Sequence, residues 1–420
     1  MSIIESQNVN EIIRKTLGII NPKIIVHGEI VGYMLYKMLE CDGRYSEQEL
    51  LDYTMLGILH DIGLYREDGL SNVADFETAG SPWPHSIYGF LFLKYLSPIG
   101  DQAEVVLYHH LDYNRYGMVK SKYAHITECL ALADKMDNFM RCEHTKIKDD
   151  YFSQYRNIRF SGNALDLFHR AEKEYGITAK LASGEYRNEL DEIMSHSVFS
   201  EKYKRGFLEM LVYSIDFRSE HTVVHTMSTV HFAMQLGRLM KVGAKDLHNM
   251  YYGALLHDLG KVAIPLDILE SPGRLGEEEM RVMRAHVRIT EMILSDLVDE
   301  DVLQIAARHH EKLDGTGYHK GLSEKDLTLP QQIVAVADML SALYGKRSYK
   351  DSFDSSKIKS ILQEDAEKHK ISKPTVDCLM EHYDAVVKEY EEQKDETIGL
   401  YLRIKQQYEE IGKKLEEIVP

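Results

Sequence analysis

LLDYTMLGILHDIG at residues 50–63 and LHNMYYGALLHDLG at residues 247–260 are two copies of one pattern. In each copy apolar side chains recur at the spacing of a helix face, and the segment closes on His-Asp followed by glycine. The copies lie about 200 residues apart in a chain of 420 residues. This internal repeat predicts two similar units in tandem.

Other segments repeat at nearly the same separation. VVLYHH (105–110) matches IAARHH (305–310), and CLALADKMDNF (129–139) matches IVAVADMLSAL (333–343). The agreement extends over most of the chain, so the repeat is expected to set its domain organisation.

The repeat divides the chain into three predicted parts. The first unit is expected at residues 1–200, the second at residues 201–390, and a helical tail at residues 391–420. The alternation typical of half-buried strands never persists, and only 9 prolines interrupt the chain. We therefore predict an all-α fold with two tandem helical domains and a C-terminal helix.

The predicted tail carries apolar side chains at alternating steps of three and four residues, which is a heptad seam. Its members are Tyr401, Ile404, Tyr408, Ile411, Leu415 and Ile418. Two interpretations fit this short seam equally well. The tail forms a coiled-coil homodimer, or it packs back on its own chain.

Composition excludes several classes of protein. With 50 Lys and Arg against 67 Asp and Glu, the formal charge is -17, which argues against binding to duplex DNA or RNA. No apolar run reaches the roughly 18 residues of a membrane span, and the first residues do not resemble a secretory signal. We therefore expect a cytoplasmic protein with no membrane contact. The 4 cysteines have no paired spacing, so neither disulfides nor a zinc ribbon is predicted.

The second repeat contains an ordered set of imidazoles and carboxylates on apolar helices. Its members are His225, His257, Asp258, His286, His309, His310 and Asp338. Such ligands suit iron, manganese or nickel, and seven of them exceed the needs of one ion. They fit two metals bridged by a carboxylate and a hydroxide, which can attack a phosphodiester.

The first repeat keeps the whole set. Its members are His27, His60, Asp61, His85, His109, His110 and Asp134. A single histidine on an apolar helix is more often a hydrogen-bonded core residue than a ligand. Two copies of the same constellation reverse that preference, because buried imidazoles need partners that metals can supply. A second dinuclear site is therefore predicted in the first unit.

Three segments of the second repeat resemble the signatures of HD-GYP domains. They are HDLGK at 257–261, HHEKLDGTGYH at 309–319 and ADMLSALYGKRSYK at 337–350. A more diverged HD domain covers the first repeat. The resemblance implies an all-helical fold around two or three metals, with iron or manganese expected. It also implies hydrolysis of cyclic di-GMP to pGpG or GMP.

The resemblance further assigns roles to single residues. It implies that the seven members of the second set are metal ligands, with Asp258 as the bridge. It also implies that Lys261 holds a phosphate oxygen of the substrate and stabilises the charge of the transition state. Substrate contacts are implied for Gly315, Gly317, Tyr318 and Arg347.

Departures from the family pattern leave alternatives open. His319 replaces the proline of the GYP motif, and Ser341 stands where the family often has aspartate. The substrate is therefore cyclic di-GMP or a related molecule such as 3′3′-cGAMP or pGpG. A signalling module without turnover is the main rival, and a hydrolase of mononucleotides or (p)ppGpp is the third. Trinuclear members use a glutamate ligand four residues before the His225 position, where this chain has His221 with Glu220 next to it, so a third metal is left open.

The first repeat lacks the substrate machinery of the second. Leu64 replaces Lys261, and HHLDYNRYGMVK at 109–120 has no GTGYH loop. We do not expect Arg66 or Lys135 to replace the missing cation. Three interpretations remain for this unit: a metal-stabilised structural partner, a redox or ligand sensor, and a second phosphate-ester hydrolase. A regulatory and structural role is preferred.

Overall fold

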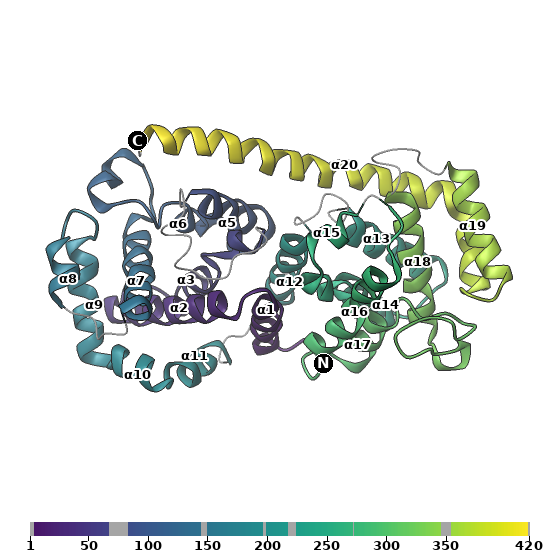
Figure 1. The fold of residues 1–420 in the computed structure, drawn as a ribbon, viewed down its shortest axis with the longest axis horizontal. Coiled ribbons are helices and arrows are strands. Elements are labelled where there is room, and N and C mark those ends of the chain that lie inside the picture. The colour runs from purple at the N-terminus through teal and green to yellow at the C-terminus, as the bar shows by residue number, and fades with distance from the viewer. Residues whose placement is uncertain are drawn as a thin grey trace. The chain divides into compact units, whose positions relative to one another are not determined.

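The computed structural model describes residues 4–66, 83–143, 149–195, 199–216, 224–271, 273–345 and 354–418. Figure 1 shows that these residues form helices joined by turns. No strand occurs within these ranges, where two isolated bridges are the sole extended pairings. The all-α fold class is confirmed.

The chain separates into two compact units that are not continuous in sequence. The C unit consists of residues Met1–Thr16 and Leu211–Leu402. The N unit consists of residues Leu17–Met210 and Arg403–Pro420. The predicted boundaries differ from this division. Residues Met1–Thr16 belong to the C unit, and residues Arg403–Pro420 belong to the N unit.

The first repeat forms the N unit, in which α2 packs on α3 and α7, and α5 packs on α6. Local signals fix the helix ends. Asn21 caps α2 and Ser46 forms a capping box with Glu49 at the start of α3. The elements are α2 (Pro22–Asp42), α3 (Glu47–Leu59), η1 (Ile62–Arg66), α5 (Trp83–Leu96), η2 (Gly100–Gln102), α6 (Glu104–Leu107), η3 (Tyr113–Met118), α7 (Ala124–Glu143), α8 (Asp149–Gln154), α9 (Gly162–Tyr175), α10 (Ile177–Ser183) and α11 (Tyr186–Ser195).

The second repeat forms the C unit with the same order of helices, so α13 packs on α14 and α18, and α14 packs on α17. Its core includes Phe232, Leu340 and Tyr383, all fully or almost fully buried. The elements of the second repeat are α12 (Glu201–Asp216), α13 (His225–Leu239), α14 (Ala244–Leu256), η4 (Leu259–Ala263), α15 (Leu266–Leu269), α16 (Glu277–Leu294), α17 (Glu300–Ala307), η5 (Glu324–Asp326), α18 (Leu329–Gly345), α19 (Ser355–Glu367) and α20 (Lys373–Ile418). The first part of α12 and the last part of α20 belong to the N unit.

The N-terminal helix α1 (Ser6–Ile20) begins in the C unit, although the repeat placed it in the first domain. Its side chains Ile12 and Ile13 are buried. Asn8 Nδ2 donates to the carbonyl of Leu297 over 2.9 Å. Helical periodicity predicts the apolar face of α1, but it does not say which core covers that face.

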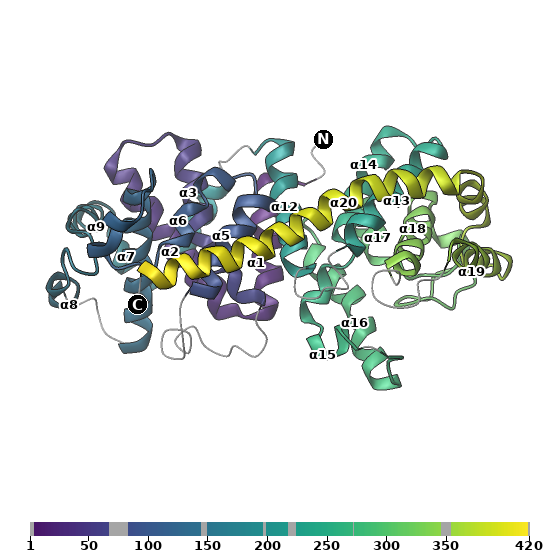
Figure 2. The ribbon, with the colours of Figure 1, turned by 90° about the horizontal axis from the view of Figure 1, so that it is seen from above.

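The tail is the last part of one uninterrupted helix, α20, which is visible in Figures 1 and 2. The helix therefore begins well before residue 391. In the N unit Tyr408 stacks on Tyr88 with ring centres 4.1 Å apart, and Ile404 and Leu415 are buried. These seam residues contact their own chain, as the second interpretation of the heptad pattern expects. The homodimer stays a prediction.

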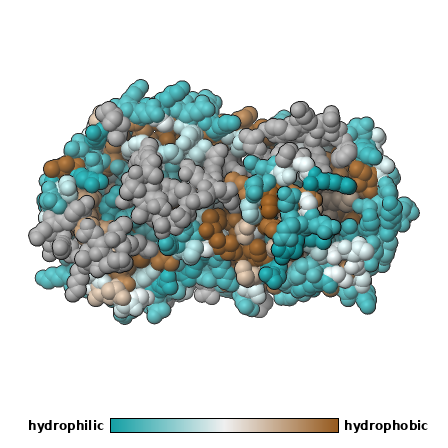
Figure 3. Space-filling model, viewed as in Figure 1, coloured by the Kyte–Doolittle hydropathy of each residue, from teal (hydrophilic) through white to brown (hydrophobic). Residues whose placement is uncertain are grey.

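The charged composition is visible at the surface. The face drawn in Figure 3 is mostly hydrophilic, with apolar side chains gathered in smaller areas. Among the helices that the structure describes, none is long and apolar enough to cross a membrane.

Candidate metal centres

The His-Asp turn follows α14, whose last turn ends at His257. Gly260 packs so closely on α16 that an added Cβ would lie 2.0 Å from the carbonyl oxygen of His286. Gly63 has the same role in the N unit, where a Cβ would lie 2.1 Å from the carbonyl of His85. The repeated glycine therefore allows the close approach that brings the histidine of the next long helix beside the His-Asp pair.

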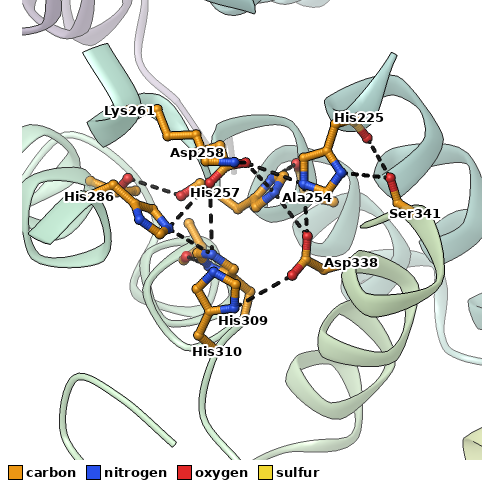
Figure 4. A network of polar contacts seen from close by, with 12 residues as sticks. His225, Ala254, His257, Asp258, Lys261, His286, His309, His310, Asp338 and Ser341 are labelled. Carbon is orange, nitrogen blue, oxygen red and sulfur yellow. Dashed lines mark hydrogen bonds and ion pairs between the residues drawn. The ribbon is translucent and has the colours of Figure 1, made fainter. Parts of the chain in front are cut away.

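The seven candidate ligands of the second repeat converge in the C unit, as Figure 4 shows, and we call this cluster the C centre. The two carboxylates lie in the middle. His225 Nε2 is 3.4 Å from Asp258 Oδ2 and 3.0 Å from Asp338 Oδ1. His286 Nε2 is 3.4 Å from Asp258 Oδ1, and His310 Nδ1 is 3.6 Å from Asp338 Oδ2.

Backbone contacts orient three of these rings. The Nδ1 atoms of His257, His286 and His309 each lie 2.6 to 2.7 Å from a carbonyl oxygen three residues earlier. Because Nδ1–H donates to that carbonyl, Nε2 is the ring nitrogen that faces the centre. Histidines that bind metals are commonly held in this way.

Buried atoms without partners test whether a metal fits. Among the described residues, His257 Nε2 and Asp258 Oδ1 are buried with no hydrogen bond. An unsatisfied buried group of this kind costs about 1–3 kcal/mol. Both atoms are of the kind that bind divalent metals, and both face the other candidate ligands. The residues present therefore fit a metal.

The pKa shifts in the C centre favour an ionised carboxylate at Asp258 and a neutral imidazole at His310. Burial alone would raise the pKa of Asp258, but His257 and Lys261 outweigh it and hold that pKa well below its usual range. Burial lowers the pKa of His310 to about 3. At neutral pH this carboxyl is ionised and this imidazole is neutral, which are the forms that bind metals.

The first repeat builds a second cluster, the N centre, from the corresponding helices. His27 Nε2 is 3.1 Å from Asp134 Oδ1, and His85 Nε2 is 3.5 Å from Asp61 Oδ1. Its seven candidate ligands form two groups, and within each group the ligand atoms lie within 4.8 Å of one another. The groups are His27, His60 and Asp134, and Asp61, His85, His109 and His110.

The N centre also contains buried donor atoms that fit a metal. Among the described residues, His60 Nε2, His109 Nε2 and Asp134 Oδ2 are buried without a hydrogen bond. The Nε2 atoms of His85 and His110 approach to 2.8 Å. Two imidazole lone pairs so close together need a proton or a metal between them, so the donor set of this centre also fits a metal.

The two centres differ in the position of a nearby cation. Lys261 Nζ lies 2.5 Å from Asp258 Oδ2, whereas its counterpart Leu64 is a buried apolar residue. Lys135 Nζ lies 3.4 Å from Asp134 Oδ2, and Asp134 is the counterpart of Asp338 rather than of Asp258. The expectation that Lys135 does not replace the missing cation stays a prediction. The long side chain reaches the carboxylate of its own neighbour, which residue spacing alone does not reveal. The side chain of Arg66 lies outside the described residues.

The sequence analysis missed the partners of the first histidine in each set. Ser341 Oγ is 2.8 Å from His225 Nδ1, and Asp137 Oδ2 is 2.6 Å from His27 Nδ1. Both partners stand three residues after the last aspartate of their set. This spacing was a usable signal, because one helix turn separates residues that share a face. Ser341, a departure from the family, therefore still holds its histidine.

The GTGYH loop lies beside the C centre. Tyr318 packs on His310 with ring centres 4.8 Å apart. Gly317 passes so near the chain that an added Cβ would lie 2.4 Å from the amide nitrogen of Lys312, and Gly315 has a φ of 78°. The loop thus places Tyr318 at the ligands and needs both glycines. The substrate contacts expected for these three residues stay a prediction.

Three residues of the sequence analysis cannot be placed. Arg347, a predicted substrate contact, lies outside the described residues. The same is true of Glu220 and His221, on which the third metal depended.

Metal binding is expected to release protons near neutral pH. Burial disfavours the charged imidazole, but neighbouring carboxylates outweigh it and raise the pKa of His257 and of His27 to about 10. A metal at Nε2 must displace these protons, so its apparent affinity rises with pH through the neutral range. Calorimetric titration of metal-free protein with Mn²⁺ in two buffers of different ionisation enthalpy measures the release. Identical heats in both buffers would contradict it.

Comparison with known proteins identifies the domain in the second repeat. Residues 209–372 match the family model described as HD domain. The 3′3′-cGAMP-specific phosphodiesterase 1 of Vibrio cholerae is 23% identical over 386 residues, covering 88% of this chain and 89% of that protein. The second repeat therefore contains an HD domain and is similar to the HD-GYP phosphodiesterases. The C unit carries the HD-GYP motifs, as the resemblance implied.

Two further comparisons bear on the HD-GYP assignment. The cyclic di-GMP phosphodiesterase response regulator RpfG of Xanthomonas campestris pv. campestris is 36% identical over 156 residues, which is 36% of this chain and 41% of that protein. The solved structure of a cyclic GMP-AMP specific phosphodiesterase of V. cholerae, V-cGAP3, covers 91% of this chain and 98% of its own. Its TM-score is 0.55 at 17% identity, so this likeness concerns the fold alone.

Proposed function

We propose that the protein is a metal-dependent phosphodiesterase that hydrolyses a cyclic dinucleotide at the C centre, with cyclic di-GMP as the first candidate substrate. One observation carries the choice of this centre. Lys261 lies beside a complete set of His and Asp side chains and against Asp258, and the GTGYH loop borders the same set. The N centre lacks that loop and has Leu64 at the lysine position.

Residues of the C unit have separate roles in this proposal. The seven members of the set hold two divalent metals, iron or manganese, with Asp258 between the two groups of ligands. When bound, the metals supply an activated water and neutralise charge on the phosphate. Lys261 donates hydrogen bonds to a phosphate oxygen and offsets the negative charge that develops during attack. Its own pKa favours this role, because Asp258 outweighs burial and raises that pKa further.

A second candidate substrate is 3′3′-cGAMP. The observation in its favour is that a relative named for this substrate matches nearly the whole chain, whereas the chain covers about two fifths of RpfG. The HD-GYP motifs alone do not distinguish the two molecules. Both contain two phosphodiester bonds joining purine nucleosides, so the same metal and lysine arrangement serves either.

Product analysis tests the proposed function. Protein loaded with Mn²⁺ or with Fe²⁺ under anaerobic conditions is incubated separately with cyclic di-GMP, 3′3′-cGAMP and pGpG, and the products are separated by chromatography. We expect linear dinucleotide or mononucleotide from at least one cyclic substrate. No turnover of any of them would reject the enzyme and favour a signalling module that only binds its ligand.

For the N unit we propose a regulatory and structural role for a second metal site. The repeated set of donors supports metal binding, and the lack of a loop like GTGYH argues against cyclic-dinucleotide turnover there. The contact of Lys135 with Asp134 places a cation beside this centre and is the observation that favours the alternative of a second phosphate-ester hydrolase. Elemental analysis of anaerobically purified protein tests occupancy: about four ions per chain are expected if both units hold two metals.

A further inference from the structure

The GTGYH loop borders the C centre through the side chain of Tyr318. Tyr318 has two close neighbours there, the His310 ring with its centre 4.8 Å away and the Arg284 guanidinium 5.1 Å from the Tyr318 ring centre. The backbone nitrogen of Tyr318 also donates to the carbonyl of His310 over 3.2 Å. A change in the position of this loop therefore changes the surface beside the metal ligands.

Two glutamates hold the loop. Glu311 is 3% exposed and accepts hydrogen bonds from the backbone nitrogens of Lys320 at 2.7 Å and Leu322 at 2.9 Å, which closes the loop on itself. Glu291 holds the loop from outside. Its Oε2 lies 2.9 Å from His319 Nε2, and its Oε1 lies 2.5 Å from Lys320 Nζ.

Glu291 connects the loop to the metal centre through one helix. It stands on α16, which also carries His286. Of its two partners, His319 follows Tyr318 directly and is less exposed than Lys320, with side chains 24% and 44% exposed. A more buried charge-assisted contact is screened less by water, so the His319 contact is expected to fix the loop more firmly.

We propose that Glu291 and His319 are positioning residues that set the place of Tyr318 and thereby select among cyclic dinucleotides. This inference rests on the proposed function. Each phosphate of a cyclic dinucleotide joins two nucleosides. When one phosphate lies at the metals, a base on either side of it therefore lies against the protein surface beside the centre, which acts as a wall. Tyr318 and Arg284 form such a wall, and a purine can stack on an aromatic ring or a guanidinium.

His319 makes the selection particular to this chain, because it stands where the family motif has proline. Proline has no side-chain donor for Glu291. Among the described residues, the other ring nitrogen of His319, Nδ1, has no hydrogen-bond partner. Substituting His319 therefore removes the contact with Glu291 without breaking another side-chain hydrogen bond in the described part of the chain.

The test compares kcat/KM for cyclic di-GMP with kcat/KM for 3′3′-cGAMP. We expect Glu291→Ala and His319→Ala each to change the ratio of the two values by about tenfold, equivalent to about 1.4 kcal/mol, with most of the change in KM. Glu291→Gln keeps an oxygen that can accept from His319, so it should restore most of the wild-type ratio. The two alanine changes combined should give no more than one alone, because they break the same contact.

Matched variants separate this role from general loss of structure. Glu278→Ala removes an exposed ion pair with Arg281 on the same helix and should leave the ratio unchanged. Lys320→Ala removes the other partner of Glu291 and should have a smaller effect than His319→Ala. Far-ultraviolet circular dichroism, thermal unfolding and metal content should match the wild type for each variant. A variant that fails to fold is replaced by Glu291→Gln combined with His319→Gln.

The possible outcomes keep the two proposals apart. If the wild type hydrolyses a cyclic dinucleotide and the folded variants keep the wild-type ratio, the positioning role is overturned and the proposed function stands. If the metal-loaded wild type hydrolyses none, the proposed function fails and the inference fails with it. A changed ratio with Glu291→Ala and its recovery with Glu291→Gln support the inference.

Discussion

Alanine at both His257 and Asp258 is expected to lower hydrolysis of the cyclic substrate by at least about a thousandfold. The change removes the carboxylate that lies between the ligand groups and an imidazole whose buried Nε2 makes no hydrogen bond within the described part of the chain. Metal assistance in such sites is worth several kcal/mol, and each 1.36 kcal/mol corresponds to about tenfold in rate. Initial rates with Mn²⁺-loaded protein measure the loss.

The internal repeat supplies the matched control. His60→Ala with Asp61→Ala makes the same change in the N unit and should leave most of the turnover. Elemental analysis should show each double variant losing the metals of its own unit alone. Turnover kept in the first variant and lost in the second would move the active centre to the N unit and reject our assignment.

Lys261→Met is expected to lower kcat by about a hundredfold to a thousandfold while the metals stay bound. Removing one preorganised donor to a developing oxyanion costs about 2.7–4 kcal/mol in other enzymes. Methionine keeps a similar length and apolar stem, so the loss reports the ammonium group. Since Asp258 raises the pKa of Lys261, the wild-type group stays charged across the neutral range.

Metal content and steady-state kinetics of the Lys261 variant distinguish two explanations. An unchanged metal content with reduced kcat supports a role in charge stabilisation. Lost metal with recovery at high Mn²⁺ would instead assign Lys261 to the integrity of the centre. Lys135→Met in the N unit is the matched control, and it should leave kcat for the cyclic substrate unchanged.

The sequence predicted the helical fold and the residues of both candidate ligand clusters because the same helical segments and the same His and Asp positions occur in both repeats. Each His and Asp had a counterpart at nearly constant separation, so the repeat identified residues that no single motif could. The structure then brought His225 and Asp338 together although more than a hundred residues separate them. Such a contact is predictable when both residues have known partners in a second copy.

Other features had no repeated signal. Glu291 and His319 interact in the C unit alone, and neither belongs to a motif that requires the other. The position of Lys135 depends on a rotamer rather than on spacing. The placement of α1 also escaped prediction, since an apolar helix face fits any apolar core. Sequence patterns thus predict the helices and the candidate ligands that lie together, whereas single ion pairs and the partners of terminal helices require coordinates.

Each unit includes a terminal segment from the other half of the sequence, and this affects how the two halves can be studied in isolation. A truncation at residue 200 would deprive the C unit of the helix that contributes Asn8, and it would leave the N unit without Tyr408 against Tyr88. Each fragment would expose an apolar surface that is covered in the full chain, which favours aggregation. Expressed halves would then be inactive for reasons unrelated to catalysis. Point substitutions in the intact chain are therefore the sound way to assign an activity to one unit.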